Sequence, residues 1–350
     1  MLWPASVRRP VNDVDCSTAD SQAVIASSLH KLGLVAANES IVMSPLTGGV
    51  SSDIWKVQLP SGALCVKRAL SQLRVKQLWE APVKRNRYEV AYLRFAQSVI
   101  PGGVPKIIAH DEVAGLFVME YLEPSHHPVW KFQLRDGLVD LNIARMVGAQ
   151  MARIHSASAN DASIAAQFPT DDIFYSIRLE PYLDATARVH GDLAPRLKEL
   201  ADITFSIKRV LVHGDIAPKN ILVGPHRPIF LDCECAWFGD PAFDLAFCLN
   251  HLLLKCLWHP AASSEFLKAF TALTESYLPY VNWEPCAEME KRTAHLLPGL
   301  FLARVDGKSP VEYLNDEGDK NKVRRCARKL LAQPVDSLDE IRETWQKELV

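Results

Sequence analysis

The chain has 350 residues, enough for two domains with a large core. Its 39 Lys and Arg nearly balance its 41 Asp and Glu, and a net charge of −2 disfavours nucleic acid as a partner. The longest apolar run, from Leu245 to Leu257, is interrupted by Asn250, His251 and Lys255, so no membrane span is expected.

The amino terminus and the cysteines indicate a cytoplasmic protein. Residues 1–15 include Arg8 and Arg9 and lack an apolar core, so we expect no secretory signal. Among eight cysteines only Cys233 and Cys235 are close, and nothing nearby completes a zinc pattern. We therefore predict reduced thiols and assign no metal to them.

The first third of the chain predicts a helix, a sheet and a second helix. Val24, Ile25 and Leu29 recur at helical spacing within residues 17–34. Apolar patterns predict strands at 41–46, 53–59, 63–69, 106–110 and 116–120, with a helix over 84–97.

Three features of this part are candidates for phosphate binding. The turn at 47–52 contains Gly48, Gly49 and Ser51, and a glycine pair lets backbone amides approach a phosphate closely. A plain hairpin turn is the alternative. Lys67 lies in the third strand, on the face opposite Arg68, and Glu89 lies in the following helix. Either side chain could instead be an ordinary surface charge.

The second part of the chain predicts mostly helices. They are expected at 138–155, within 171–189, and at 243–258, 263–280, 284–305, 319–331 and 337–350. His155, at the end of the first of these helices, is interpreted as a hydrogen-bonding partner of the helix end or of a neighbouring loop.

The most informative stretch is 210–249. Short apolar strands at 210–212, 221–223 and 228–231 adjoin Asp215, Asn220 and Asp232, so two carboxylates and one carboxamide should come together. Phosphoryl transfer needs a carboxylate to deprotonate a hydroxyl and hard oxygen ligands for Mg²⁺. The alternative, a turn cap and a strand end, explains either acid alone but not the whole set.

This stretch resembles the catalytic motif of the aminoglycoside phosphotransferase and choline kinase family. The similarity rests on five short segments, namely His213-Gly214-Asp215, Asn220, Asp232-Cys233-Glu234, Gly239-Asp240-Pro241 and Asp244-Leu245-Ala246. It implies an α+β, two-lobed, protein-kinase-like fold with an N-terminal antiparallel sheet lobe and a mainly helical C-terminal lobe. The implied domains are 1–128 and 129–350, with a hinge near 120–124.

The resemblance also implies roles for individual residues. Asp215 would be the catalytic base, Asn220 and Asp232 the Mg²⁺ ligands, and Asp240 and Asp244 acids that hold loops. The residues implied in ATP binding are Lys67, which would hold phosphates, its partner Glu89, the turn residues Gly48, Gly49 and Ser51, and Glu120 and Leu122 at the hinge. The reaction implied is transfer of the γ-phosphate of ATP to a hydroxyl of a small molecule.

The chain also contains a second His-Gly-Asp, at 190–192. The fifth residue after its aspartate is Leu197, and no strand pair or further acid follows. We therefore interpret this copy as a helix end and loop without catalytic function.

The acceptor is not specified by the sequence. Aromatic residues such as Trp258 would suit a cation, whereas Arg304 and Lys308 would suit a sugar, so aminoglycoside-, choline- and sugar-like acceptors all stay open. Residues 178–183 are weakly similar to methylthioribose kinases. Substrate contacts of Glu234, Arg304, Lys308, Arg324 and Arg325 are open as well, with a solvated helix end as the favoured interpretation of the three arginines.

Other classes of protein fit the sequence less well. A protein kinase is disfavoured, because Asp232-Cys233-Glu234 stands where Asp-Phe-Gly would be expected. A catalytically weak pseudokinase that binds nucleotide or a protein partner is the main alternative, and a purely structural protein is a third. The joint presence of Lys67, Asp215, Asn220 and Asp232 argues against both. The choice between ATP and GTP stays open, as does the oligomeric state.

Overall fold

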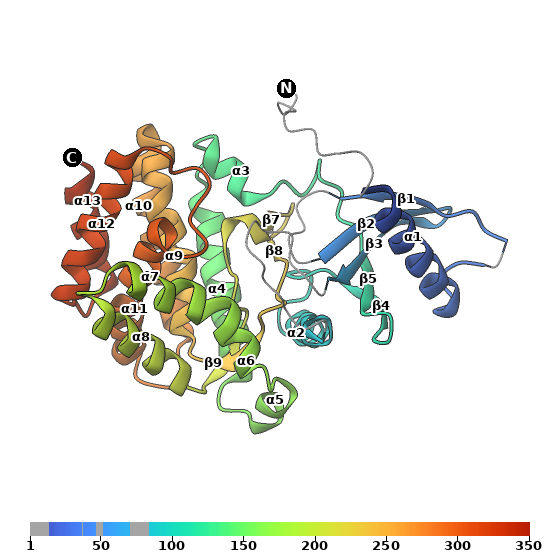
Figure 1. Cartoon of the computed structure of the whole chain (residues 1–350), viewed down its shortest axis with the longest axis horizontal. Coiled ribbons are helices and arrows are strands. Elements are labelled where there is room, and N and C mark those ends of the chain that lie inside the picture. Colours follow the sequence, from blue (N-terminus) through green and yellow to red (C-terminus); the bar gives the residue numbers. More distant parts are fainter. Residues whose placement is uncertain (1–13, 37, 47–51, 71–83) are drawn as a thin grey trace. The chain divides into compact units, whose positions relative to one another are not determined.

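The computed structural model describes residues 14–36, 38–46, 52–70 and 84–350. The chain forms two compact units: the first comprises residues up to Arg87 together with Ile107–Tyr121, and the second comprises Tyr88–Lys106 and Leu122–Val350 (Figure 1). The turn residues Gly48, Gly49 and Ser51 lie outside the described residues.

The first unit is built on an antiparallel sheet of five strands in the order β1-β2-β3-β5-β4. All five strands were expected, and their bounds are β1 (Val42–Pro45), β2 (Ser52–Leu59), β3 (Gly62–Ala69), β4 (Ile107–Asp111) and β5 (Leu116–Glu120). The predicted antiparallel N-terminal sheet is therefore confirmed.

Helix α1 (Val14–Lys31) covers one face of this sheet. Ile25 and Leu29 of the helix pack in one core with Trp55 and Val66 from the strands. Successive side chains of a strand point to opposite faces, and the residue after Val66, Lys67, is itself buried, at 3% exposure. The solvent-facing alternative for Lys67 is therefore wrong.

Helix α2 (Arg85–Val99) crosses from the first unit to the second at Tyr88. In the second unit, the Cys233 Sγ contacts the backbone oxygen of Glu89 at 3.6 Å, and the ring of Tyr92 meets that of His213 edge-on with centroids 5.2 Å apart. Lys67 and Glu89 belong to different units, so their pairing stays a prediction.

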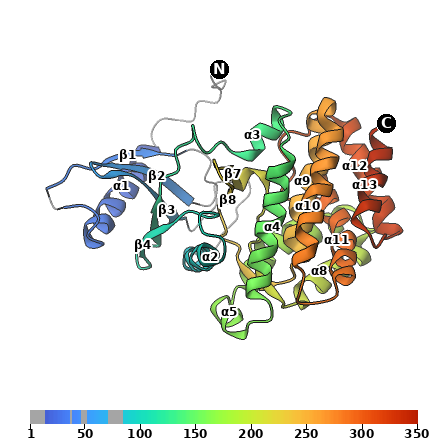
Figure 2. The ribbon, with the colours of Figure 1, turned by 180° about the vertical axis from the view of Figure 1, so that it is seen from behind.

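The rest of the second unit is mainly helical, as expected. Its long helices are α4 (Leu141–Ser158), α9 (Ala242–Trp258), α10 (Ser263–Tyr277), α11 (Cys286–Asp306), α12 (Glu317–Ala332) and α13 (Leu338–Leu349). Figure 2 shows α4 beside α10. Gly148 permits this close approach, because a Cβ there would lie 2.3 Å from the Leu273 oxygen.

Several elements of this unit differ from expectation. The helix expected within 171–189 consists of α6 (Asp171–Phe174), a wider π-helical segment η1 (Tyr175–Asp184) and α7 (Ala185–Val189). Pro181 lies inside η1 and has no N–H for the regular helical ladder, which explains the irregular turn. Elements that were not predicted are α3 (Trp130–Arg135), α5 (Ala162–Gln167), α8 (Ala194–Ser206), β9 (Trp237–Gly239) and the short turns η2 (Pro218–Asn220), η3 (Pro260–Ala262) and η4 (Leu278–Tyr280).

The described helices and cysteines bear on the expectations about a membrane span and about reduced thiols. None of the described helices combines the length and the hydropathy needed to cross a bilayer. The seven cysteines with described side chains, which begin with Cys65, are all free thiols, and the prediction of reduced thiols is confirmed for them.

Candidate active site

Two short strand pairs hold the loop that carries the motif. Strand β6 (Val210–Val212) pairs with β9, and β7 (Ile221–Val223) pairs with β8 (Pro228–Phe230). The loop between β6 and β7 contains Asp215 and ends at Asn220, whose backbone oxygen accepts from the Leu231 N–H at 2.9 Å. Asp232 follows directly, in the left-handed region with φ 65°. The pairing therefore brings the expected residues into one neighbourhood.

Asp215 is buried, and its two carboxylate oxygens have different surroundings. Its Oδ2 accepts hydrogen bonds from Lys219 Nζ at 2.9 Å and Asn220 Nδ2 at 2.8 Å, and it forms an ion pair with Arg178, whose Nη2 lies 3.0 Å away. None of the described residues donates to Oδ1. One carboxylate oxygen is thus held by two hydrogen bonds and an ion pair, and the other is left available to a ligand.

The charges around Asp215 keep it ionised. Burial is the largest single influence on its pKa and raises it, but the charges of Arg178 and Lys219 oppose burial, and the pKa ends below its ordinary value. His213 is buried too, and burial lowers its pKa, so its ring is neutral at pH 7. The His213 Nδ1 accepts from the Asp215 N–H at 3.2 Å. The site therefore holds a carboxylate at neutral pH.

Asp244 of α9 holds the start of the loop between β6 and β7. Its carboxylate accepts from the backbone N–H of His213 at 2.7 Å and of Gly214 at 2.8 Å. His155 Nε2 lies 3.2 Å from Asp244 Oδ2, while His155 Nδ1 lies 2.7 Å from the Tyr277 hydroxyl. The interpretation of His155 as a cap of a helix end or loop is wrong, because its ring points into the packing of α4 against α10 and α9.

Gly214 is required by the loop itself. Its φ is +79°, and a Cβ at this position would lie 2.8 Å from the Cys235 oxygen. A larger residue would be strained and would push against the backbone beside it.

Asp240 ties the segment after β9 to α11. It accepts from Arg292 Nη2 at 3.0 Å, and Arg292 also pairs with Glu284 at 2.7 Å. Burial is the largest influence on the pKa of Asp240 and raises it above the ordinary value. The geometry gives Asp240 a role in holding the loop, as the resemblance implied.

The sequence reasoning missed Arg178 and Lys219. Lys219 lies inside the motif, four residues after Asp215, and this spacing within a loop could have identified it. Arg178 comes from η1, far earlier in the chain, and also donates through Nε to the Gly214 oxygen. Its only sequence signal was the short similarity at 178–183, which does not indicate a contact with Asp215.

Asn220 and Asp232 provide a donor set that fits Mg²⁺. The Asn220 amide nitrogen donates to the Asp215 oxygen at 3.1 Å and to Oδ2, so the amide oxygen is directed away from Asp215. After burial, Arg178 and Lys219, the next influence on the pKa of Asp215 is the charge of Asp232, which raises it. The two carboxylates are therefore near each other. Hard oxygens from two residues suit an ion that keeps waters and phosphate oxygens as its other ligands.

The residues implied in ATP binding are distributed over both units. Lys67 and Glu120 belong to the first unit, on β3 and at the end of β5, and Leu122 begins the second segment of the second unit. The unit boundary between Tyr121 and Leu122 lies within the expected hinge. The roles of these residues stay predictions.

The second His-Gly-Asp has a different environment. It follows the end of α7, and His190 Nε2 lies 2.8 Å from Asp306 Oδ2. Asp192 pairs with Arg328 and has a side chain that is 61% exposed. Arg324 also pairs with Asp306, at 2.7 Å. This copy joins α7 to α11 and α12 through ion pairs.

Besides Arg324, three more of the residues left open in the sequence have partners in the structure. Lys308 pairs with Glu180 at 2.8 Å, and Arg325 pairs with Glu348 at 2.6 Å. Arg304 is not a solvated helix end: it is buried at 7% exposure, because the chain after α11 folds back over it and Ser309 accepts from its guanidinium. The preferred interpretation of Arg304 is therefore wrong.

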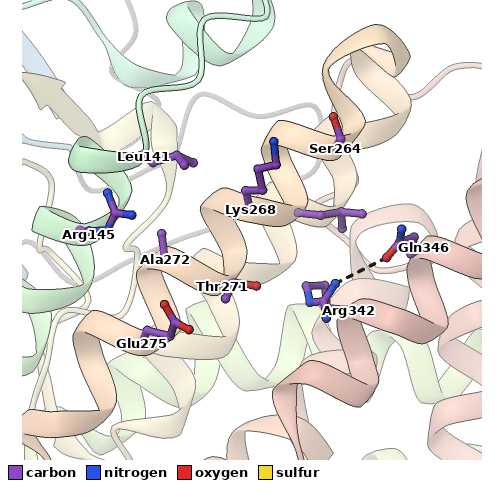
Figure 3. Close-up of a pocket in the computed structure, with 10 residues that line it drawn as sticks. Leu141, Arg145, Ser264, Lys268, Thr271, Ala272, Glu275, Arg342 and Gln346 are labelled. Atoms are coloured by element: carbon purple, nitrogen blue, oxygen red, sulfur yellow. Dashed lines mark hydrogen bonds between the residues drawn. The ribbon is translucent and has the colours of Figure 1, made fainter.

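An open groove elsewhere does not contain the motif. It has a volume of about 440 Å³ and lies between α4, α10 and α13 (Figure 3). Arg342 in its wall contacts Gln346 at 3.5 Å and Asp339 at 3.3 Å. Its cations have local partners and no buried carboxylate lines it, so we assign the active site by the geometry around Asp215.

Comparison with known proteins identifies the family. The model of the phosphotransferase enzyme family matches residues 42–289, which include both strand pairs, Asp215, Asn220 and Asp232. The chain therefore belongs to the phosphotransferase enzyme family.

The individual relatives have low sequence identity to this chain. Methylthioribose kinase 2 of Oryza sativa subsp. japonica is 23% identical over 248 residues, 62% of this chain and 57% of the rice protein, so the chain spans less than two thirds of that relative. Methylthioribose kinase of Bacillus velezensis is 28% identical over 268 residues, 69% of this chain and 67% of that protein. The crystal structure of choline kinase from Cryptosporidium parvum is similar with a TM-score of 0.56 at 13% identity, covering 89% of this chain and 97% of that one. The last likeness shows a kinase-like fold.

Proposed function

We propose that the protein transfers the γ-phosphate of ATP to a hydroxyl group of a small molecule. The observation that carries the proposal is the asymmetry of Asp215. Arg178, Lys219 and Asn220 hold Oδ2, and Oδ1, to which none of the described residues donates, can accept the proton of a hydroxyl. Membership of the phosphotransferase enzyme family supports the same reaction.

In this mechanism Asp215 orients the acceptor and takes its proton. The acceptor hydroxyl donates to Oδ1, its oxygen forms a bond to the γ-phosphorus, and the bond from that phosphorus to the bridging oxygen of ADP breaks. The hydroxyl proton passes to the Asp215 carboxylate. Because Arg178 and Lys219 keep the pKa of Asp215 low against the effect of burial, the proton is readily lost to water after product release.

We infer that Asn220 and Asp232 hold Mg²⁺ through the amide oxygen and the carboxylate. The ion would neutralise charge on the phosphates. The nucleotide itself would be held by Lys67, with Glu89 as its partner, by the turn with Gly48, Gly49 and Ser51, and by the hinge at Glu120 and Leu122. The burial of Lys67 supports its part in this assignment.

The acceptor is a small molecule with a hydroxyl group. Curated relatives are named methylthioribose kinases, and this supports a sugar-like acceptor. A cytoplasmic location, where ATP is abundant, stays a prediction.

A coupled assay of ATP consumption tests the proposal. We expect at least one compound in a panel of sugars, sugar acids and amino alcohols to raise ATP consumption above the slow hydrolysis in water, with formation of a phosphate ester seen by phosphorus NMR. Tight nucleotide binding without phosphate ester from any acceptor would favour the pseudokinase alternative.

A further inference from the structure

A group of buried polar side chains is linked to Arg178 through the ring of Phe247. The guanidinium of Arg178 lies 5.9 Å from the centre of the Phe247 ring. That ring meets the rings of His251 and Tyr182 edge-on, with centroids 5.5 and 5.4 Å apart. Tyr182 in turn accepts a hydrogen bond from Arg304 at 2.9 Å. Direct contacts therefore lead from the candidate base to His251 and Arg304.

Arg304 is a buried cation, and none of the described acidic residues pairs with it. Its Nη1 donates to the Tyr182 hydroxyl and to the oxygen and hydroxyl of Ser309, all of them uncharged groups. Its Nε is buried and has no hydrogen-bond partner among the described residues. A buried arginine is ordinarily paired with an anion, because loss of water is costly for a charge.

Two side chains near Arg304 also have buried polar atoms without a hydrogen-bond partner in the described part of the chain. Within the described chain, the Nε2 of His251 and the hydroxyl of Tyr313 are buried and lack hydrogen-bond partners. Burial is the main influence on the pKa of His251 and lowers it well below its ordinary value, and the charge of Arg304 comes next in size. Three unpartnered buried polar atoms in one place are unusual in a folded protein. A ligand that supplies acceptor oxygens would satisfy them.

Lys255 adds a buried amine on the same side of α9. It is 1% exposed, with Nζ 4.1 Å from the Trp258 ring centre and 3.9 Å from that of Tyr313. The one acid with a favourable effect on it, Glu312, already pairs with Lys131. Burial, followed by the charge of Lys131, lowers the pKa of Lys255 to about 6. The amine is therefore mostly neutral at pH 7, and a bound anion would raise its pKa and favour the charged form.

We propose that Arg304, His251, Tyr313 and Lys255, here called the Arg304 cluster, bind an anionic group of the acceptor, and that the acceptor is an acidic hydroxyl compound. A carboxylate or a phosphate supplies the oxygen acceptors that an arginine fork recognises. A cationic acceptor such as an amino sugar would be repelled by the charge of Arg304. This inference rests on the proposed function, because it concerns the substrate of the Asp215 site.

A series of six-carbon sugar derivatives that differ in charge tests the proposal on the unaltered protein. Glucose is neutral, glucosamine is cationic, gluconate carries a carboxylate and glucose 6-phosphate carries a phosphate. We expect calorimetry to show at least one acidic compound binding about tenfold or more tighter than glucose, and glucosamine binding weakest. The comparison of gluconate with glucose 6-phosphate identifies the anion. Equal binding of all four compounds, or no binding of either acid, contradicts the proposal.

Matched variants locate the interaction. Arg304→Gln is expected to weaken binding of the preferred acid by about thirtyfold, because it removes one partner of a desolvated charge pair. Lys255→Met replaces a buried amine with an apolar chain of similar length, keeps the fold, and should weaken the same binding severalfold. Arg325→Gln, at an exposed pair with Glu348, is the control and should change nothing. Unchanged acid binding in Lys255→Met and Arg304→Gln overturns the assignment.

The two proposals fail in different ways. Turnover of ATP that depends on Asp215 but shows no preference for an acidic acceptor contradicts the Arg304 cluster alone. Acid binding that Arg304→Gln abolishes, in a protein that never forms a phosphate ester, contradicts the phosphotransfer proposal alone.

Discussion

The tripeptide His-Gly-Asp occurs twice in this chain, and its two copies differ in everything that surrounds them. At 213–215 the aspartate is 4% exposed and bonded to Arg178, Lys219 and Asn220, with Asp244 holding the backbone beneath it. At 190–192 the aspartate is exposed and pairs with Arg328. The comparison teaches that the tripeptide alone does not define a catalytic base. Burial, fixed hydrogen-bond donors and a second acid nearby make the aspartate of one copy a candidate base.

The glycines of the two copies give the largest expected difference in stability. Gly214→Ala places a Cβ 2.8 Å from the Cys235 oxygen at φ +79°, whereas a Cβ at Gly191 meets nothing within 4 Å. We expect Gly214→Ala to lower the free energy of unfolding by about 2 kcal/mol or more. Gly191→Ala should stay within about 0.5 kcal/mol of the unaltered protein. Chemical denaturation of both variants measures this difference, and equal losses would contradict the strained turn.

Only the first copy should be coupled to a metal. Asp232→Ala removes a proposed Mg²⁺ ligand, so nucleotide affinity in Mg²⁺ should fall by about tenfold or more while affinity in chelator stays the same. Asp306→Ala, which removes the acid beside His190, is the control. Calorimetry with a non-hydrolysable ATP analogue gives both constants. If the unaltered protein bound the analogue equally with Mg²⁺ and with chelator, the metal assignment would be wrong.

The histidine of the first copy gives a smaller, pH-dependent effect. Burial lowers the pKa of His213, so below pH 6.5 the unfolded chain binds a proton that the folded chain does not. Stability therefore falls as the pH drops through 6.5 towards the folded pKa, by up to about 1.4 kcal/mol per pH unit from this group. His213→Asn should make the pH profile of unfolding flatter between pH 6.5 and 5. A profile with unchanged slope would contradict the buried neutral ring.

Much of this comparison could be predicted from the sequence. Strand periodicity and turn residues located the loop, and the spacing from Asp215 to Asn220 and Asp232 separated the two copies before any contact was known. Helix ends near 141 and 258 were predicted to within a few residues, because apolar spacing continues to them. These are local signals.

What could not be predicted depends on contacts between distant segments. Arg178 reaches Asp215 from an irregular π-helical segment, and nothing in local periodicity indicates that partner. Arg304 was expected at a solvated helix end, since the fold-back of Ser309 over it is a tertiary event. His155 likewise looked like a helix-end residue, and its partners Tyr277 and Asp244 come from two other helices. A single sequence carries no record of such pairs.

The most direct test of the central claim compares Asp215→Asn with Asp192→Asn on one acceptor that the unaltered protein phosphorylates. Asparagine keeps the size of the side chain and removes the basic oxygen, so turnover of Asp215→Asn should fall by about 10² to 10⁴-fold with nucleotide binding nearly unchanged. Turnover of Asp192→Asn should equal that of the unaltered protein. Near-normal turnover in Asp215→Asn, or a large loss in a folded Asp192→Asn, would contradict the assignment of the base.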